Sequence, residues 1–79
     1  ILCHHAIIKH NFEFCNLKKA NFAGADLTRA NLSNTDLTDA IFLNANLQGA
    51  RLTGATVTRA NFKGANVAGA DLRQIKRGL

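Results

Sequence analysis

The chain has 79 residues, with ten Lys and Arg against five Asp and Glu and a formal net charge of +5. This length allows one small domain, and no stretch approaches the ~20 consecutive apolar residues that a membrane-spanning helix needs. The basic balance permits weak attraction to phosphate or acidic surfaces without requiring it. Two cysteines are too few for a disulfide framework.

The first nine residues fit the pattern of the later chain poorly, and we expect them to form an N-terminal cap or an irregular first turn. Two alternative hypotheses concern this region. A disulfide between Cys3 and Cys15 would pin the cap. Cys3, Cys15, His4, His5 and His10 have side chains that suit zinc, but their spacing matches no known finger pattern. We therefore predict no metal site and no cofactor.

A five-residue repeat begins near residue 10 and continues to residue 74. The residue two places before each large apolar position is mostly alanine, and the residue directly before it is mostly Asn or Asp. The unit therefore reads Ala, then Asn or Asp, then Leu or Phe, then two variable residues. The large apolar positions, which we predict to form the structural core, are Phe12, Leu17, Phe22, Leu27, Leu32, Leu37, Phe42, Leu47, Leu52, Val57, Phe62, Val67 and Leu72.

A period of five fits neither an α-helix nor a plain strand. On a helix, five-residue steps advance about 140° beyond a full turn, so the large apolar side chains would spiral around it. On a strand, odd steps alternate between the two faces, so half of these side chains would face water. A backbone that turns once in every five residues keeps them all on one side, and such a chain must coil around an interior.

The repeat resembles that of the pentapeptide-repeat family. The best local matches are Ala20-Asn21-Phe22-Ala23-Gly24, Ala45-Asn46-Leu47-Gln48-Gly49 and Ala60-Asn61-Phe62-Lys63-Gly64. The resemblance implies an all-β fold, a right-handed quadrilateral β-helix with four pentapeptides per coil and about four coils. The Leu or Phe and the Ala positions would point inward. Residues 20 apart should then stack, which places Phe22, Phe42 and Phe62 in one interior column.

This reading divides the chain into three parts. We expect an N-terminal cap or irregular first turn over 1–9, a pentapeptide-repeat solenoid over 10–74 and a C-terminal tail or cap over 75–79. Solenoid ends expose unpaired backbone groups and apolar interior. We therefore expect a protein partner, either a second copy in a homodimer or a larger assembly, at the solenoid ends or at the patch described next.

One repeat departs from the pattern at Ile41-Phe42-Leu43. Ile41 replaces the usual Asn or Asp, and Leu43 should point outward, with Lys63 as a neighbour in the stack. An exposed apolar pair can mark a contact surface. Ile41, Leu43 and Lys63 are therefore the candidate interaction patch, and incidental surface hydrophobicity is the alternative explanation.

The sequence contains no recognisable catalytic apparatus. It lacks a Ser-His-Asp order with a plausible elbow, a phosphate-cradling Gly-rich loop and paired carboxylates in an evident pocket. We therefore expect no enzyme and no small-molecule substrate, but a non-catalytic structural or protein-interaction module.

Two other functions are compatible with the sequence. Some members of the family resemble duplex DNA and bind DNA gyrase, but such mimicry needs an acidic surface and the net charge of +5 disfavours it. Weak binding of nucleic acid through the basic ends, at Lys18, Lys19, Arg73, Lys76 and Arg77, is the second alternative. The resemblance is compatible with the bacterial cytoplasm and with the chloroplast thylakoid lumen.

Overall fold

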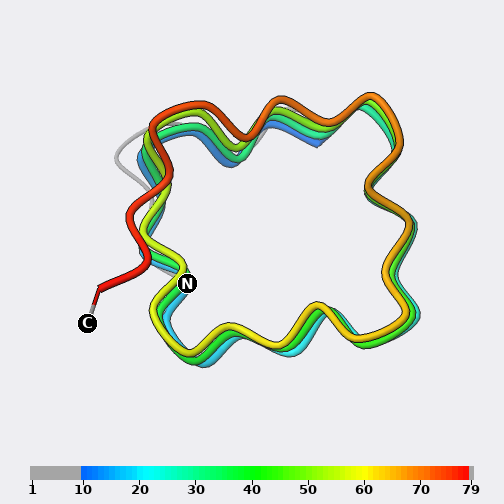
Figure 1. Ribbon diagram of the computed structural model, residues 1–79, viewed down its shortest axis with the longest axis horizontal. Coiled ribbons are helices and arrows are strands. Elements are labelled where there is room, and N and C mark those ends of the chain that lie inside the picture. Colours follow the sequence, from blue (N-terminus) through cyan, green and yellow to red (C-terminus); the bar gives the residue numbers. More distant parts are fainter. Residues whose placement is uncertain (1–9, 79) are drawn as a thin grey trace.

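The computed structural model describes residues 10–78. Over this range the chain winds around a four-sided outline, and successive coils lie almost on top of one another (Figure 1). The described residues contain no helix and no continuous strand, only turns and isolated β-bridges. The strands expected of an all-β fold are reduced to single paired residues, because the backbone turns again before a second residue can pair.

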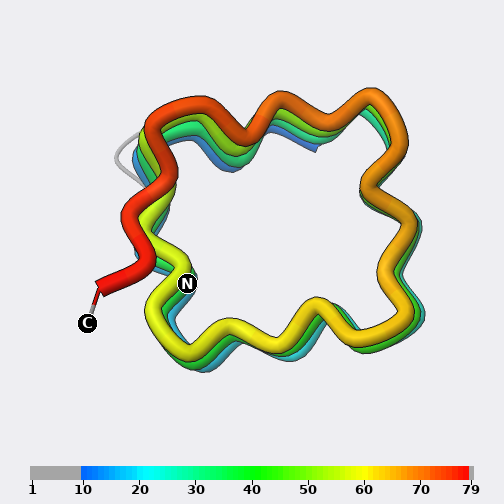
Figure 2. The backbone as a smooth tube through the Cα atoms, viewed as in Figure 1, coloured from blue at the N-terminus to red at the C-terminus, as the bar shows by residue number. Residues whose placement is uncertain are grey.

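The coils stack in the register that the family resemblance implies. Every isolated bridge in the described part of the chain is parallel and joins residues that are 20 apart. Asn11 pairs with Asn31, and the same column continues through Arg51 to Asp71. The tube view shows the coils following one another around the same corners (Figure 2). Four pentapeptides therefore complete one coil, and the expected stacking of residues 20 apart is confirmed.

Backbone hydrogen bonds hold neighbouring coils together. The Phe42 N–H donates to the Asn61 carbonyl at 2.7 Å, and the Asn61 N–H donates back to the Ala40 carbonyl at 2.9 Å. Between consecutive repeats, the Ala45 N–H closes the turn on the Phe42 carbonyl at 3.0 Å. The same three bonds recur in other repeats of the ladder. Each coil therefore depends mainly on the coils directly before and after it.

The third residue of each turn has a positive φ, as type II turns require. Glycine takes this conformation without steric cost, for example at Gly64, where φ is 73°. An L-residue pays roughly 1–2 kcal/mol for it, which explains why glycine recurs at this position. The non-glycine residues that nevertheless adopt it there are Phe14, Lys19, Arg29, Asn34, Asp39, Asn44, Arg59 and Gln74.

Asn and Asp before the core residue close a second hydrogen bond in the turn. The Asn21 side-chain oxygen accepts from the Ala23 N–H at 2.9 Å, and Asn61 accepts from the Lys63 N–H at 3.0 Å. A short carboxylate or amide side chain can reach a backbone N–H two residues onward. The preference for Asn or Asp in the repeat therefore has a local structural cause.

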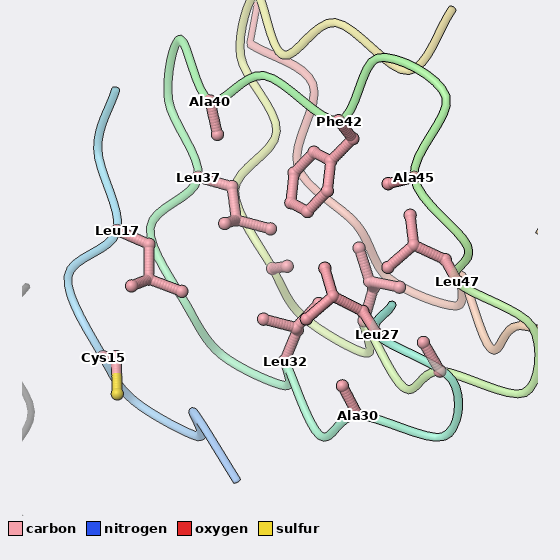
Figure 3. Close-up of a cluster of buried hydrophobic side chains, with 13 residues drawn as sticks. Cys15, Leu17, Leu27, Ala30, Leu32, Leu37, Ala40, Phe42, Ala45 and Leu47 are labelled. Atoms are coloured by element: carbon pink, nitrogen blue, oxygen red, sulfur yellow. The ribbon is translucent and has the colours of Figure 1, made fainter. Parts of the chain in front are cut away.

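The interior is filled by the Leu or Phe positions together with the alanines (Figure 3). Buried members of the predicted core are Leu17, Leu27, Leu32, Leu37, Phe42, Leu47 and Leu52, and they pack with the buried alanines Ala30, Ala40, Ala45, Ala50 and Ala55.

The predicted core is less buried toward the two ends of the described coils. Phe12, Phe22, Val57 and Phe62 are half-buried. Val67 and Leu72, expected in the interior, keep 39% and 42% of their surface exposed. Both line the same hollow as Leu52, so they face inward. They are exposed because no further coil lies over them within the described residues.

Candidate interaction surfaces

The patch expected from the sequence lies on the side of the solenoid that carries the column Asn21, Ile41 and Asn61. We call this side the Ile41 face. The three residues are joined by parallel bridges, and each is exposed, with Ile41 at 36%. Polar neighbours in the coils before and after therefore flank one exposed aliphatic side chain.

Ile41 makes the same backbone hydrogen bonds to the neighbouring coil as other repeats, but not the side-chain hydrogen bond within the turn. Its N–H donates to the Ala20 carbonyl at 2.9 Å, and its own carbonyl accepts from the Phe22 N–H at 2.7 Å. An isoleucine side chain has no oxygen, however, so it cannot accept from the Leu43 N–H as Asn21 does from Ala23. The β-branched side chain suits the extended backbone, but the repeat loses one hydrogen bond.

Leu43 and Lys63 lie next to one another on the same face. The Asn44 N–H donates to the Lys63 carbonyl at 2.9 Å, and the Gly24 N–H donates to the Leu43 carbonyl at 2.9 Å. These bonds place Leu43 between the coil of Gly24 and the coil of Lys63. Leu43 is half-buried and Lys63 is exposed. The structure thus brings the three patch residues onto one face, with Ile41 as the most exposed large apolar side chain among them.

The charged residues form pairs along another side. Arg59 donates to both carboxylate oxygens of Asp39, at 2.8 and 3.2 Å, from the next coil. These hydrogen bonds hold the pKa of Asp39 below its ordinary value, and the positive charges of Arg59 and Lys19 act in the same direction. Lys19, Asp39 and Arg59 therefore alternate in charge along one column of the solenoid, but such exposed pairs contribute little to stability.

Of the five residues considered as zinc ligands, only His10 and Cys15 lie within the described part of the chain. Among residues 10–78, no group of three His, Cys, Asp or Glu side chains could hold a metal ion. Cys15 is buried and disulfide-bonded. Cys3, His4 and His5 lie outside the described residues, and so does the expected N-terminal cap.

A hollow that the sequence did not predict opens at the last described coil. It has a cavity volume of about 440 Å³, and its apolar wall consists of Leu52, Val57, Phe62, Val67, Leu72 and Ile75. Arg59 and Arg77 also line it. We call it the C-terminal hollow. The signal that could have indicated it is the position of Val67 and Leu72 in the last complete set of four repeats.

No helix of the described chain has the length and apolar character needed to cross a membrane. The family model for pentapeptide repeats (8 copies) matches this chain over residues 11–42 and 40–76. No curated protein matches the chain.

Several solved structures are similar to the chain. A pentapeptide repeat protein from the cyanobacterium Cyanothece is 32% identical with a TM-score of 0.46, over 86% of this chain and 44% of that one. A pentapeptide repeat protein of the Arabidopsis thaliana thylakoid lumen is 28% identical with a TM-score of 0.45, over 84% of this chain and 46% of that one.

A third structure is HetL, a pentapeptide repeat protein involved in heterocyst differentiation regulation in Nostoc, which is 25% identical with a TM-score of 0.26, over 84% of this chain and 46% of that one. The chain thus spans less than half the length of each of these three proteins. Because the family model matches most of the chain, from residue 11 to residue 76, the chain belongs to the pentapeptide-repeat family.

Proposed function

We propose that this chain is a non-catalytic protein-interaction module whose contact surface is the Ile41 face. In this proposal, a right-handed quadrilateral β-helix of about four coils holds Ile41, Leu43 and Lys63 on one rigid side. The partner is a protein, either a second copy of the chain or a component of a larger assembly. The proposal involves no chemical step, only the burial of an aliphatic pair beside one cationic side chain.

The observation that carries the proposal is the presence of Ile41 where most repeats have Asn or Asp. In the same position of most described repeats, an Asn or Asp accepts a turn hydrogen bond, which is worth ~1 kcal/mol in a typical protein. Ile41 forgoes that bond and leaves an aliphatic side chain 36% exposed. Neither feature stabilises the isolated solenoid, so a contact that buries Ile41 is the simplest reason for both.

The surface favours a protein partner over a nucleic acid. Aromatic side chains that could stack on bases are scarce, since Phe14 is the one exposed aromatic residue among residues 10–78. Mimicry of duplex DNA is disfavoured too, because Asp36, Asp39 and Asp71 are each paired with a Lys or Arg. Three of the five acidic side chains are therefore neutralised by a neighbouring base.

The test uses two substitutions that both restore the turn bond. Ile41→Asn gives the Leu43 N–H an acceptor and removes the apolar contact. Thr56→Asn gives the Thr58 N–H an acceptor on a different side of the solenoid, and serves as the matched control. We expect both variants to be slightly more stable in urea than the parent chain, by about 1 kcal/mol each.

Binding should separate the two variants. The mass in solution is measured over a concentration series, and capture of proteins from an extract of the native source is compared among the three chains. We expect the parent and Thr56→Asn to self-associate or to retain the same protein, and Ile41→Asn to lose that association. Equal association by all three chains, or association by none, would refute the proposal.

A further inference from the structure

The outward residues of the Ile41 face repeat almost symmetrically before and after its middle coil. Three coils lie on top of one another along this side, drawn in cyan, green and yellow at the bottom of Figure 2. Asn21 and Asn61 flank Ile41 in one column, and parallel bridges join them to it. A second column has the same symmetry and consists of Gly24, Asn44 and Gly64. A half-turn about the middle coil therefore exchanges like residues in both columns.

The third column of the face departs from this symmetry in a complementary way. It consists of Ala23, Leu43 and Lys63. Ala23 and Lys63 are both exposed, and one side chain is a single methyl group whereas the other is long. The half-turn places Lys63 of one copy over Ala23 of another, where the small side chain leaves room for the long one. Leu43 meets its own counterpart.

Charge does not oppose the contact of this face with itself. Lys63 is the one charged side chain among residues 20–24, 40–44 and 60–64, and it forms no ion pair with a described residue. After the half-turn, the two copies of Lys63 lie two coil spacings apart, roughly 10 Å. Salt screens exposed charges strongly at that distance. Each lysine is instead opposite a neutral alanine.

The asparagines beside Ile41 have hydrogen-bonding capacity left for such a contact. The side-chain oxygens of Asn21 and Asn61 each accept one backbone N–H within their own turn. Their NH₂ groups donate no hydrogen bond within the described residues, and an amide oxygen has a second lone pair. The half-turn brings Asn21 of one copy opposite Asn61 of the other. Two amide pairs would therefore enclose the apolar contact.

The exposure of Ile41 belongs to the side of the solenoid, since described coils lie directly before and after it. It nevertheless keeps 36% of its surface exposed. The molecule has extents of 30 × 29 × 22 Å, and a side of 29 by 22 Å offers roughly 600 Å² per copy, which is each partner's share in the smallest specific interfaces. An interface of this size suits a reversible dimer.

We propose that the Ile41 face binds a second copy of the chain in an antiparallel dimer, whose two-fold axis runs between the copies and parallel to the middle coil. The dimer rests on the function proposed above, whose partner it names. Ile41 and Leu43 contact their own counterparts at the centre. Lys63 of each copy lies over Ala23 of the other, and every contact away from the axis occurs twice, as two-fold symmetry requires.

A charge exchange tests the pairing of positions 23 and 63. Ala23→Lys places a lysine opposite Lys63 of the second copy, and in low-salt buffer we expect the dissociation constant of the dimer to rise by ~10-fold or more. Ala23→Lys combined with Lys63→Ala again sets one lysine opposite one alanine, and should restore the parent value. Ala68→Lys adds the same charge at the same repeat position on another side, and should change nothing. Sedimentation equilibrium over a concentration series measures the four chains.

A disulfide cross-link tests the antiparallel direction. Chains with Ala23→Cys and with Lys63→Cys are mixed under mild oxidation, and we expect a covalent heterodimer because the two positions face one another. Ala23→Cys alone should give far less covalent dimer, since its two new cysteines lie two coil spacings apart, roughly 10 Å, which is too far for a disulfide. The parent chain has two cysteines of its own and serves as the blank.

Three outcomes would overturn the dimer. The first is a parent chain that stays monomeric at ~1 mM; if a protein from the native extract is still captured only by chains that keep Ile41, the proposed function stands and its partner is a different protein. The second is a dimer that Ala23→Lys does not weaken or that the exchange with Lys63→Ala does not restore. The third is equal cross-linking by Ala23→Cys alone and by the mixture. Thermal melts of each variant establish that the solenoid remains folded.

Discussion

The rings of Phe42 and Phe62 lie parallel, with an interplanar angle of 1° and centroids 4.8 Å apart. Phe22 continues the stack on the other side of Phe42, at 5.2 Å and 14°. The ring separation equals the usual distance between paired strands, so the aromatic column and the backbone ladder have the same spacing. Phe42, at the centre, is fully buried.

Removal of the Phe42 ring should therefore be costly. Phe42→Ala leaves a cavity between two rings, and we expect the free energy of unfolding to fall by about 3–5 kcal/mol. Phe42→Leu fills part of the space and should cost clearly less. Urea denaturation followed by circular dichroism measures both. A Phe42→Ala variant as stable as Phe42→Leu would contradict the stacked interior.

Two glycines at equivalent turn positions should respond differently to alanine. Gly24 and Gly64 have nearly the same φ, 71° and 73°, so alanine suffers the same backbone strain at each. A Cβ at Gly24 meets no atom within 4 Å, whereas a Cβ at Gly64 collides with the Asn44 side chain. We expect Gly64→Ala to destabilise the chain more than Gly24→Ala, by up to about 1 kcal/mol, because the exposed Asn44 side chain must move away from the added methyl group. The double variant Gly64→Ala with Asn44→Gly should recover part of the difference, and thermal denaturation measures it.

Two buried hydroxyl groups offer another matched pair. The Thr35 hydroxyl donates to the Leu32 carbonyl at 2.7 Å, whereas the buried Ser33 hydroxyl has no hydrogen-bond partner. An unpaired buried polar group is unfavourable, and its removal relieves that penalty. We expect Ser33→Ala to be neutral or stabilising by up to about 1 kcal/mol, and Thr35→Val to be destabilising. Urea unfolding that orders the two variants the other way would contradict this assignment.

Low pH should lower the stability of the fold, because its aspartates become protonated. The hydrogen bond from the Thr38 hydroxyl, at 2.6 Å, is the main cause that lowers the pKa of Asp36 below its ordinary value. The pKa values of Asp39 and Asp71 are lowered as well, chiefly by bonds from Arg59 and Arg73. A carboxylate whose pKa is lowered by folding contributes stability above its unfolded pKa, and that contribution is lost as the pH falls through the folded pKa.

We therefore expect the free energy of unfolding to decrease as the pH falls from about 5 to about 2. Asp36→Asn keeps an oxygen for the turn bond to Thr38 but cannot be protonated in this range. It should lower stability near neutral pH and reduce the slope of the pH profile. Urea titrations at several pH values measure both effects, and a variant with an unchanged slope would exclude Asp36 as a contributor.

The five-residue period predicted a chain that coils around an interior, and the family resemblance, which implies four repeats per coil, supplied the register. Five-residue spacing of Leu and Phe, with alanine two places before, left coiling around an interior as the one arrangement that buries them all. The column of Phe22, Phe42 and Phe62 followed from that register, and the ring contacts confirm it. Such predictions succeed because each repeat makes the same local bonds, so that one unit specifies the others.

Other features depended on what lies next to a residue in space. Phe14 and Arg59 adopt a left-handed backbone, which local preference would assign to glycine, because the bonds to neighbouring coils fix the turn. Ser33 was expected on the outside by its place in the repeat, yet it is 4% exposed. The C-terminal hollow depends on the absence of a further layer over Val67 within residues 10–78, and the regular core positions alone did not distinguish Val67 from the buried Leu47.

The parallel bridges join residues 20 apart, and this has a consequence for how such a chain can change in length. Loss or gain of four consecutive repeats leaves every later residue on its original side. Loss of a single repeat between Phe42 and Phe62 would also preserve the interior, since the next repeat supplies a Leu, Phe or Val. It would, however, rotate all that follows by a quarter turn. Lys63 would then leave the side of Ile41, so surface patterns here constrain chain length more strictly than folding does.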